Sequence, residues 1–167
     1  LADWAADFLS ALGRERAFVA GHSLGSLVAL ELAMRRPDLV AALVLAGTSV
    51  PMPVGEAFLA AAKDDSPEAH AMQSVWGHAR LSPLATSPVP GASLLAAGRR
   101  LVERAAPGVQ HAGLAACHAY SPDPARLAAL AMPVTVIAGR FDQMTPARAG
   151  EAVARAIPGA RFVTVNA

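Results

Sequence analysis

Short apolar runs alternate with amphipathic stretches along most of the chain. The first two runs, residues 17–20 and 40–46, contain no polar alternation, which is typical of strands buried on both faces of a parallel sheet. Residues 134–138 form a third apolar run, and residues 161–165 alternate between apolar and polar side chains. We therefore predict four strands.

Helical periodicity appears between the predicted strands. Residues 1–12 and 24–36 repeat apolar positions at helical spacing, and the second stretch ends in two basic residues before Pro37. After the third strand, Thr145 is predicted to cap a helix in which Pro146 takes the first position. The alternation of strand and helix predicts an α/β fold with a parallel sheet of about four strands.

The segment between the second and third strands differs in composition from the rest. Nine of the 13 prolines and four of the five His lie between residues 51 and 124. Helical windows can be placed at residues 56–63, 67–79, 94–106 and 109–119. Because a structureless connection of this length is uncommon in a compact domain, we predict a helical insertion over one end of the sheet. Residues 51–126 would form this insertion, and residues 1–50 and 127–167 would form the core.

Composition and charge exclude several classes of protein. Hydrophobic residues make up 54% of the 167 residues and charged ones 16%, so the chain is not of the polar, disordered kind. The net charge of +1 gives no electrostatic reason to expect a nucleic acid or an anionic membrane as partner. The longest apolar stretch, residues 39–46, is far shorter than the ~18 residues of a membrane span, so we expect no membrane partner.

Cysteine and histidine usage argues against disulfides and metals. Cys117 is the only cysteine, which excludes an intrachain disulfide and a cysteine-based zinc site. A reducing compartment fits this usage, and we expect a cytoplasmic protein. A metal site made of His111, Cys117 and His118 is disfavoured because adjacent residues on a helix point apart. We expect no metal and no other cofactor.

Residues 21–25 carry the motif with the clearest chemistry. They read Gly-His-Ser-Leu-Gly between a predicted strand and a predicted helix, the setting in which G-x-S-x-G indicates a nucleophile elbow. A sharp turn would strain Ser23 and expose its hydroxyl, while Gly21 and Gly25 let the neighbouring backbone approach. The N–H of Leu24 would then face an oxyanion beside Ser23, and the helix N-terminus would add positive potential. The alternative is a Gly-Ser turn in which Ser23 is an ordinary N-cap.

This motif in its setting resembles the α/β-hydrolase superfamily. The resemblance extends from the strand before Ser23 to the last predicted strand, and it implies that residues 51–126 are the cap domain that shapes the substrate pocket. It also places the catalytic acid in the loop after the strand that follows the cap, where Asp142 takes the matching position. A capping or turn aspartate is the alternative. Because Thr145 already serves as the predicted cap, we expect Asp142 to have no local structural role.

Some relatives carry the acid after the preceding strand instead. There this sequence reads Ala46-Gly47-Thr48-Ser49, with no carboxylate, which favours Asp142.

The resemblance implies the chain order Ser, acid, His, yet no His follows Asp142. The chain also begins inside a predicted helix, without the earlier strands and the loop that supply a second oxyanion donor in the family. We therefore expect the sequence to be a piece of a longer protein. His22 adjoins Ser23, but successive side chains of such a turn diverge, so we do not predict it to be the base. As an elbow residue, His22 is predicted to pack beneath the end of the sheet or to form a hydrogen bond with a neighbouring loop.

The pocket and the reaction follow from the resemblance. Trp76, His78, His118 and Tyr120 are the candidates to line a pocket for a small-molecule substrate. The predicted function is a serine hydrolase of a small ester, lactone or thioester, with Ser23 as nucleophile and Asp142 orienting the His.

Two alternatives stay open. One is a non-catalytic member that binds a small molecule or a partner. The other is a C–C hydrolase or haloperoxidase-like enzyme with the same triad. A haloalkane dehalogenase is disfavoured, because its nucleophile is Asp and position 23 is Ser.

Overall fold

A four-stranded parallel sheet organises the chain in the computed structural model, which describes residues 1–77 and 92–166. The strands are β1 (Ala17–His22), β2 (Val40–Ala46), β3 (Val134–Gly139) and β4 (Arg161–Val165), and they lie side by side in chain order. Across the sheet, Val19 pairs with Leu43, Leu45 with Val136, and Val136 with Phe162. The predicted parallel α/β sheet is confirmed.

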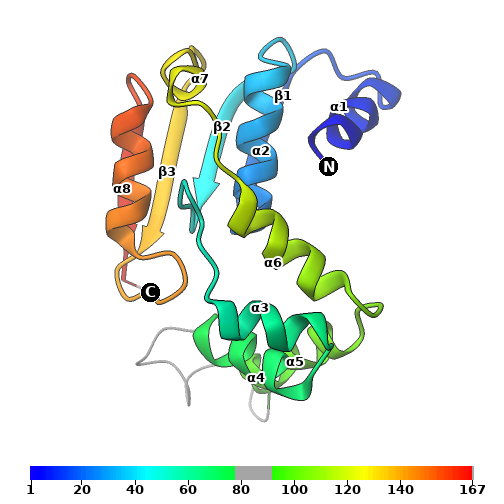
Figure 1. The fold of residues 1–167 in the computed structure, drawn as a ribbon. Coiled ribbons are helices and arrows are strands. Elements are labelled where there is room, and N and C mark those ends of the chain that lie inside the picture. The colour runs from blue at the N-terminus through cyan, green and yellow to red at the C-terminus, as the bar shows by residue number, and fades with distance from the viewer. Residues whose placement is uncertain (78–91, 167) are drawn as a thin grey trace.

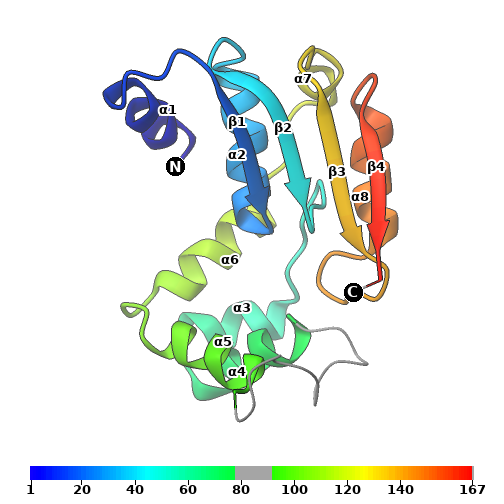
Figure 2. The ribbon, with the colours of Figure 1, turned by 180° about the vertical axis from the view of Figure 1, so that it is seen from behind.

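Helices cover one face of this sheet. The two that pack on the strands, α2 (Leu24–Arg35) and α8 (Ala147–Ala156), lie on the same side (Figures 1 and 2). At the β1 edge, α1 (Ala2–Ala11) packs against α2, and the short α7 (Pro124–Ala128) precedes β3. None of the helices in the described part of the chain is long and apolar enough to cross a membrane.

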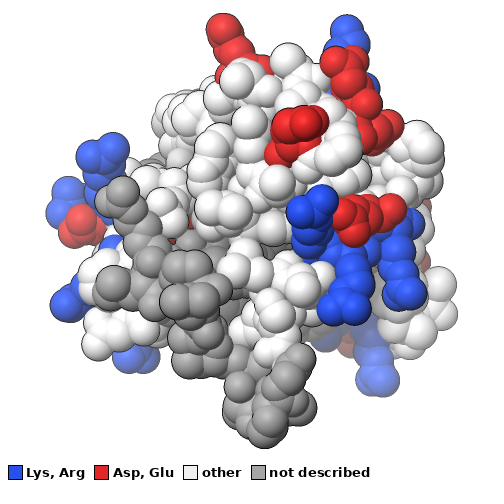
Figure 3. Space-filling view, turned by 90° about the horizontal axis from the view of Figure 1, so that it is seen from below, with Lys and Arg blue, Asp and Glu red and all other residues white. Residues whose placement is uncertain are grey.

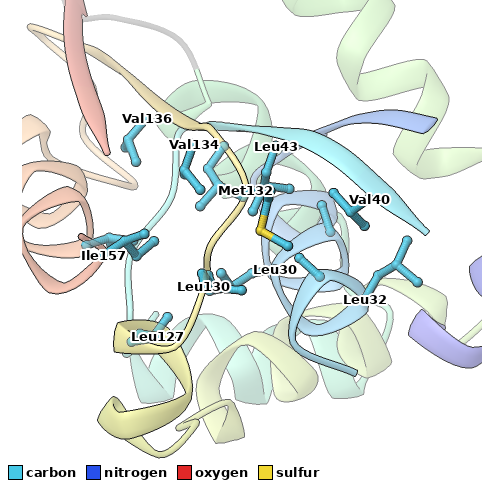
Figure 4. Packing of buried hydrophobic residues seen from close by; sticks show 14 of the residues in the cluster. Leu30, Leu32, Val40, Leu43, Leu127, Leu130, Met132, Val134, Val136 and Ile157 are labelled. Atoms are coloured by element: carbon cyan, nitrogen blue, oxygen red, sulfur yellow. The ribbon is translucent and has the colours of Figure 1, made fainter. Parts of the chain in front are cut away.

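The main hydrophobic core lies between the sheet and these helices (Figure 4). Leu30 of α2, Leu43 and Leu45 of β2, Val136 of β3 and Ile157 after α8 are almost fully buried there. Burying such a side chain contributes about 1.5–3 kcal/mol to stability. This core holds the strand ends, which carry the candidate site, in fixed positions.

The opposite face of the sheet is bare in the described structure. Successive residues of β1 alternate between half-buried and exposed, and Phe18 exposes 87% of its surface. Our prediction that the first strand is buried on both faces is therefore wrong. The run at residues 17–20 shows no polar alternation because both of its outward positions, Phe18 and Ala20, are apolar; the polar outward residue of β1, His22, lies beyond the run.

Four helices lie beyond the carboxyl ends of the strands (Figure 1). They are α3 (Glu56–Lys63), α4 (Pro67–Trp76), α5 (Leu94–Glu103) and α6 (Val109–Ala119). Their small core contains Phe58, Ala62 and Ala69, with Leu114 of α6 packed against it. We call α3–α6 the helical segment. Because it stands over the carboxyl edge of the sheet, it faces the end at which parallel α/β folds bind ligands.

Candidate active site

Ser23 lies at the junction between β1 and α2 with a strained backbone. Its φ of 52° and ψ of −124° are unusual for a residue other than glycine. The Ser23 N–H donates to the carbonyl of Ala46 at 3.0 Å, and the Ser23 carbonyl accepts from the N–H and hydroxyl of Ser26 at 2.8 and 2.6 Å. Ser23 occupies the N-cap position of α2, but its side chain makes no capping hydrogen bond. The hydroxyl is therefore not used as the ordinary helix cap that was the alternative.

The two glycines of the motif have different reasons to be present. A Cβ on Gly21 would lie 2.1 Å from the carbonyl oxygen of Gly25, so the first turn of α2 crosses the end of β1 too closely for any side chain. A Cβ on Gly25 would meet nothing within 4 Å. The expected close approach therefore requires glycine at position 21 and not at position 25.

Leu24 is the first residue of α2. Its N–H is one of the four at a helix start that have no acceptor within the helix, and it directly follows Ser23. The Leu24 side chain points to the helical segment, where its Cδ2 would lie 3.4 Å from a Cβ on Gly113 of α6. The helix α6 thus packs against the turn through Leu24.

Asp142 lies in the loop between β3 and α8 and organises that loop. Its Oδ1 accepts hydrogen bonds from the N–H groups of Met144 at 2.9 Å and Thr145 at 2.8 Å, and its Oδ2 accepts from the Thr145 hydroxyl at 2.8 Å. Our prediction that Asp142 has no local role is therefore wrong. The carboxylate is held in one orientation by three donors.

The predicted capping of α8 by Thr145 is also wrong. The helix begins at Ala147, and Pro146 occupies the N-cap position without a side-chain cap. The Thr145 hydroxyl donates instead to a carboxylate, and such a charge-assisted hydrogen bond is stronger than one between neutral groups.

Gly47, at the end of β2, lies between the two loops. Its φ is 53°, and a Cβ there would lie 3.2 Å from Thr145 Oγ1 and 3.3 Å from His22 Nε2. The side chains of His22 and Thr145 therefore converge on Gly47 from β1 and from the Asp142 loop. The carboxyl ends of three neighbouring strands form one continuous surface.

A cavity of about 360 Å³ opens on this surface. Ser23 and Thr145 line it on the sheet side, and side chains of the helical segment line the other side. The full lining is Ser23, Met52, Pro53, Val54, Gly55, Phe58, Trp76, Leu114, Cys117, Gln143, Met144 and Thr145. Burial raises the pKa of the Cys117 thiol, which keeps this group neutral.

The four residues expected at the pocket lie in different places. Trp76 lines the cavity, where its ring meets Phe58 edge to face with ring centroids 5.5 Å apart. His118 Nδ1 lies 3.1 Å from both the backbone nitrogen and oxygen of Val54, and Tyr120 donates its hydroxyl to Glu31. His78 lies outside the described residues.

Several lining residues were missed by the sequence reasoning. Met52, Phe58, Leu114 and Cys117 line the cavity. In the sequence, the last three are indistinguishable from core residues of predicted helices, and Met52 lies between two prolines outside them. Only the orientation of the helices separates the two roles. Their position in the inserted segment was the one available signal.

Glu31 ties the end of the helical segment to α2. Its side chain is 13% exposed and accepts hydrogen bonds from Arg35 Nε at 2.7 Å and the Tyr120 hydroxyl at 2.9 Å, with Arg126 at 3.4 Å. Burial raises the pKa of Glu31, but the bonds from Arg35 and Tyr120 and the charge of Arg126 outweigh this, so that the pKa lies below its ordinary value. Burial and the Glu31 carboxylate together raise the pKa of the Tyr120 phenol.

No group of three or more His, Cys, Asp or Glu side chains could hold a metal ion in residues 1–77 and 92–166. The chemistry that the described site offers is a hydroxyl, a carboxylate and the N–H groups at a helix start.

A parallel sheet with a strained Gly-x-Ser-x-Gly turn at its carboxyl edge is the arrangement of the α/β-hydrolase class. The sequence model of the family described as alpha/beta hydrolase fold matches residues 1–87, more than half of the chain. The chain belongs to this family. Among curated proteins, none matches the chain.

Solved structures of the same fold resemble the chain over nearly its whole length. A hydrolase from Pseudomonas aeruginosa PA01 is 29% identical with a TM-score of 0.75, and the match covers 100% of this chain and 63% of that one. An esterase from Thermogutta terrifontis is 25% identical with a TM-score of 0.74, covering 98% and 61%.

An enol-lactonase from Burkholderia xenovorans LB400 is 22% identical with a TM-score of 0.79, covering 99% and 63%, and shows likeness of fold alone. The chain thus spans less than two thirds of the length of these solved proteins.

Proposed function

We propose that the protein containing this chain is a serine hydrolase that cleaves a small ester, lactone or thioester. The observation that carries the proposal is Ser23, strained at a strand-to-helix turn, with a side chain that does not cap the helix and that lines a cavity. The similarity to a hydrolase and to an esterase at 25–29% identity supports it. The helical segment takes the part of a cap over this cavity.

In the proposed reaction, Ser23 Oγ attacks the substrate carbonyl and its proton passes to a histidine base. The N–H of Leu24 donates to the oxyanion that forms. The base returns the proton to the leaving group as the bond to the acyl carbon breaks, and water then releases the acyl group from Ser23 by the same steps. We assign the base to none of the five His of this sequence.

Asp142 is proposed to orient that base. Three hydrogen bonds already fix its carboxylate. Little further conformational entropy would therefore be lost when one of its oxygens accepts a hydrogen bond from the imidazole. The same bonds suit a purely structural turn, so mutagenesis has to separate the two roles.

Labelling with a fluorophosphonate tests the nucleophile in the complete protein. We expect Ser23 to be labelled covalently and Ser23→Ala to abolish labelling, because an activated hydroxyl reacts faster than an ordinary one. Ser10→Ala serves as control, since Ser10 lies on α1 and its hydroxyl donates to the Ala6 carbonyl within that helix. Stoichiometric labelling of another serine in Ser23→Ala would contradict the assignment.

A second substitution tests the acid. Asp142→Asn keeps an oxygen that can accept from Met144 and Thr145, and we expect kcat to fall by about 10⁴ because the histidine tautomer is no longer fixed. Asp123→Asn, at the cap of α7, should leave kcat within about twofold, as a surface change remote from the chemistry does. Near-normal turnover of Asp142→Asn would place the acid elsewhere.

A further inference from the structure

The described residues that line the cavity beside Ser23 carry no formal charge. Among the residues that the structure describes, all twelve that line it are uncharged. Cys117, the one readily ionisable group in the lining, is kept as a neutral thiol by burial. Among these described residues, a ligand in the cavity therefore meets no cationic side chain that would bind an anion.

Most polar side chains of the lining come from the sheet end of the cavity, and its aromatic side chains come from the helical segment. Ser23, Gln143 and Thr145 lie in the segments that follow β1 and β3, together with the apolar Met144. Phe58 and Trp76 form a T-shaped aromatic pair in the helical segment, where Leu114 also faces the cavity. A substrate whose carbonyl lies at Ser23 would thus extend its remaining part toward an apolar wall.

One charged group directly behind the lining has the wrong sign to bind an anionic ligand. Thr145 lines the cavity and donates its hydroxyl to Asp142 at 2.8 Å. The carboxylate behind this wall repels a second anion. Figure 3 views the molecule from the end that carries the helical segment; the charged side chains visible on its described surface form groups of both signs, the largest on the right of the view and another along its left edge.

We propose that the protein selects small neutral esters with an apolar acyl group and discriminates against esters that carry a carboxylate on the acyl chain. The inference rests on the proposed function and specifies the substrate class of the same site. The cavity volume of about 360 Å³ lies near the lower end of ligand pockets, which favours a short acyl chain.

Two matched esters test the inference in the complete protein. Ethyl butyrate and monoethyl succinate place a methyl group and a carboxylate at the same distance from the reacting carbonyl. We expect kcat/KM to be higher for ethyl butyrate by a factor of about 100 or more, because the carboxylate loses its hydration without gaining a partner. Titration of the released acid at constant pH measures both substrates alike.

Substitutions at neighbouring positions of α4 separate charge from packing. Trp76 lines the cavity and Val75 does not, and both are exposed, at 41% and 59%, so that an arginine at either position can reach water. Trp76→Arg should reduce the preference for ethyl butyrate by about tenfold or more relative to Trp76→Leu, because only the arginine adds a positive charge to the wall. Val75→Arg should leave the preference within about twofold, since its charge points away from the cavity and is screened by water.

The outcomes distinguish the two levels of the argument. Ser23-dependent hydrolysis of both esters at equal rates, or faster hydrolysis of monoethyl succinate, would overturn the inference and leave the proposed function in place. Absence of Ser23-dependent hydrolysis of either ester would contradict the proposed function. Calorimetric titration with 2-pentanone and with 4-oxopentanoate, which differ in the same way, would then decide the inference: tighter binding of the anion would overturn it, and tighter binding of the neutral ketone would support it.

Discussion

At the scale of single residues, the close crossing of α2 over β1 restricts which residue types position 21 can hold. The carbonyl oxygen of Gly25 occupies the space that a side chain at position 21 would need. That crossing also sets the backbone of Ser23, because the turn must reverse direction within one residue. The strain at Ser23 is therefore maintained by packing around it.

The two glycines provide a matched pair for a stability measurement. We expect Gly21→Ala to lower the free energy of unfolding by about 2–4 kcal/mol, because its Cβ would overlap backbone atoms that cannot move away. Gly25→Ala should change it by no more than about 1 kcal/mol, since its Cβ meets open space in a helix. Urea unfolding of both variants of the complete protein provides the comparison. Equal losses of unfolding free energy in the two variants would show that α2 and β1 leave room for a side chain at position 21.

The sequence predicted part of this site and not the rest. The spacing Gly-x-Ser-x-Gly between an apolar run and an amphipathic stretch was sufficient to predict the strand-to-helix turn at Ser23. The role of Thr145 was predicted wrongly, because a threonine before a proline suits both a helix cap and a hydrogen bond to a carboxylate three residues earlier. Only the backbone path from Asp142 to Ala147 decides between them.

At the scale of elements, the Glu31 cluster joins segments that are distant in sequence. It connects α2 with Tyr120 at the end of α6 and with Arg126 of α7. Because Glu31 is mostly buried, removing its charge weakens the hydrogen bonds from Arg35 and Tyr120 and takes away the counter-charge of Arg35 and Arg126. This contact is one of those that join the helical segment to α2, beside the packing of Leu24 and Leu27 on α6.

The acid dependence of stability tests the cluster. The pKa of Glu31 is lower in the folded state than in the unfolded chain, so its stabilisation is present above about pH 4.3 and is lost as the pH falls through the folded-state value. We expect Glu31→Gln to lower the free energy of unfolding at pH 7 by about 1–3 kcal/mol and to flatten the acid limb of the stability curve. Glu103→Gln removes an exposed pair with Arg99 and should cost no more than about 0.5 kcal/mol. An unchanged acid limb in Glu31→Gln would contradict this role.

The elements themselves were predicted more accurately than their orientations. The strands begin where the apolar runs begin, because a run that is long enough for a strand and is bounded by turn residues has few other stable arrangements. The helix at Pro124–Ala128 was missed, since five residues do not define a helical period. Which side chains of α3, α4 and α6 face the cavity depends on how these helices pack together, and periodicity alone does not fix that.

At the scale of the whole molecule, one face of the sheet carries no helix in the described structure (Figure 2). Phe18 stands on it, and the register places Val44 and then Ile137 and Val163 on the same side of the sheet. On α1, the stacked rings of Trp4 and Phe8 are exposed as well. Large apolar patches of this kind mark interaction surfaces or sites of aggregation.

The 167-residue chain expressed by itself should therefore self-associate. We expect it to bind a hydrophobic dye and to form oligomers in light scattering, and Phe18→Lys to reduce both, because this side chain is 87% exposed at an edge strand. Phe162→Lys is the control, since Phe162 packs against the main core and a lysine there should unfold the chain. A monomer that binds no dye would refute the expectation.

The helical segment lies in the connection between two adjacent strands, and this affects how the sequence of such a protein can evolve. Residues 47–133 connect the carboxyl end of β2 to the amino end of β3, and the pairing of these two strands fixes both points. The entropy of closing a loop grows only with the logarithm of its length, so that doubling it costs about 0.6 kcal/mol. Insertions and deletions that reshape the cavity wall can therefore accumulate while Ser23 and Asp142 keep their places. Under the proposed function, we therefore expect substrate preference to diverge faster than the reaction itself.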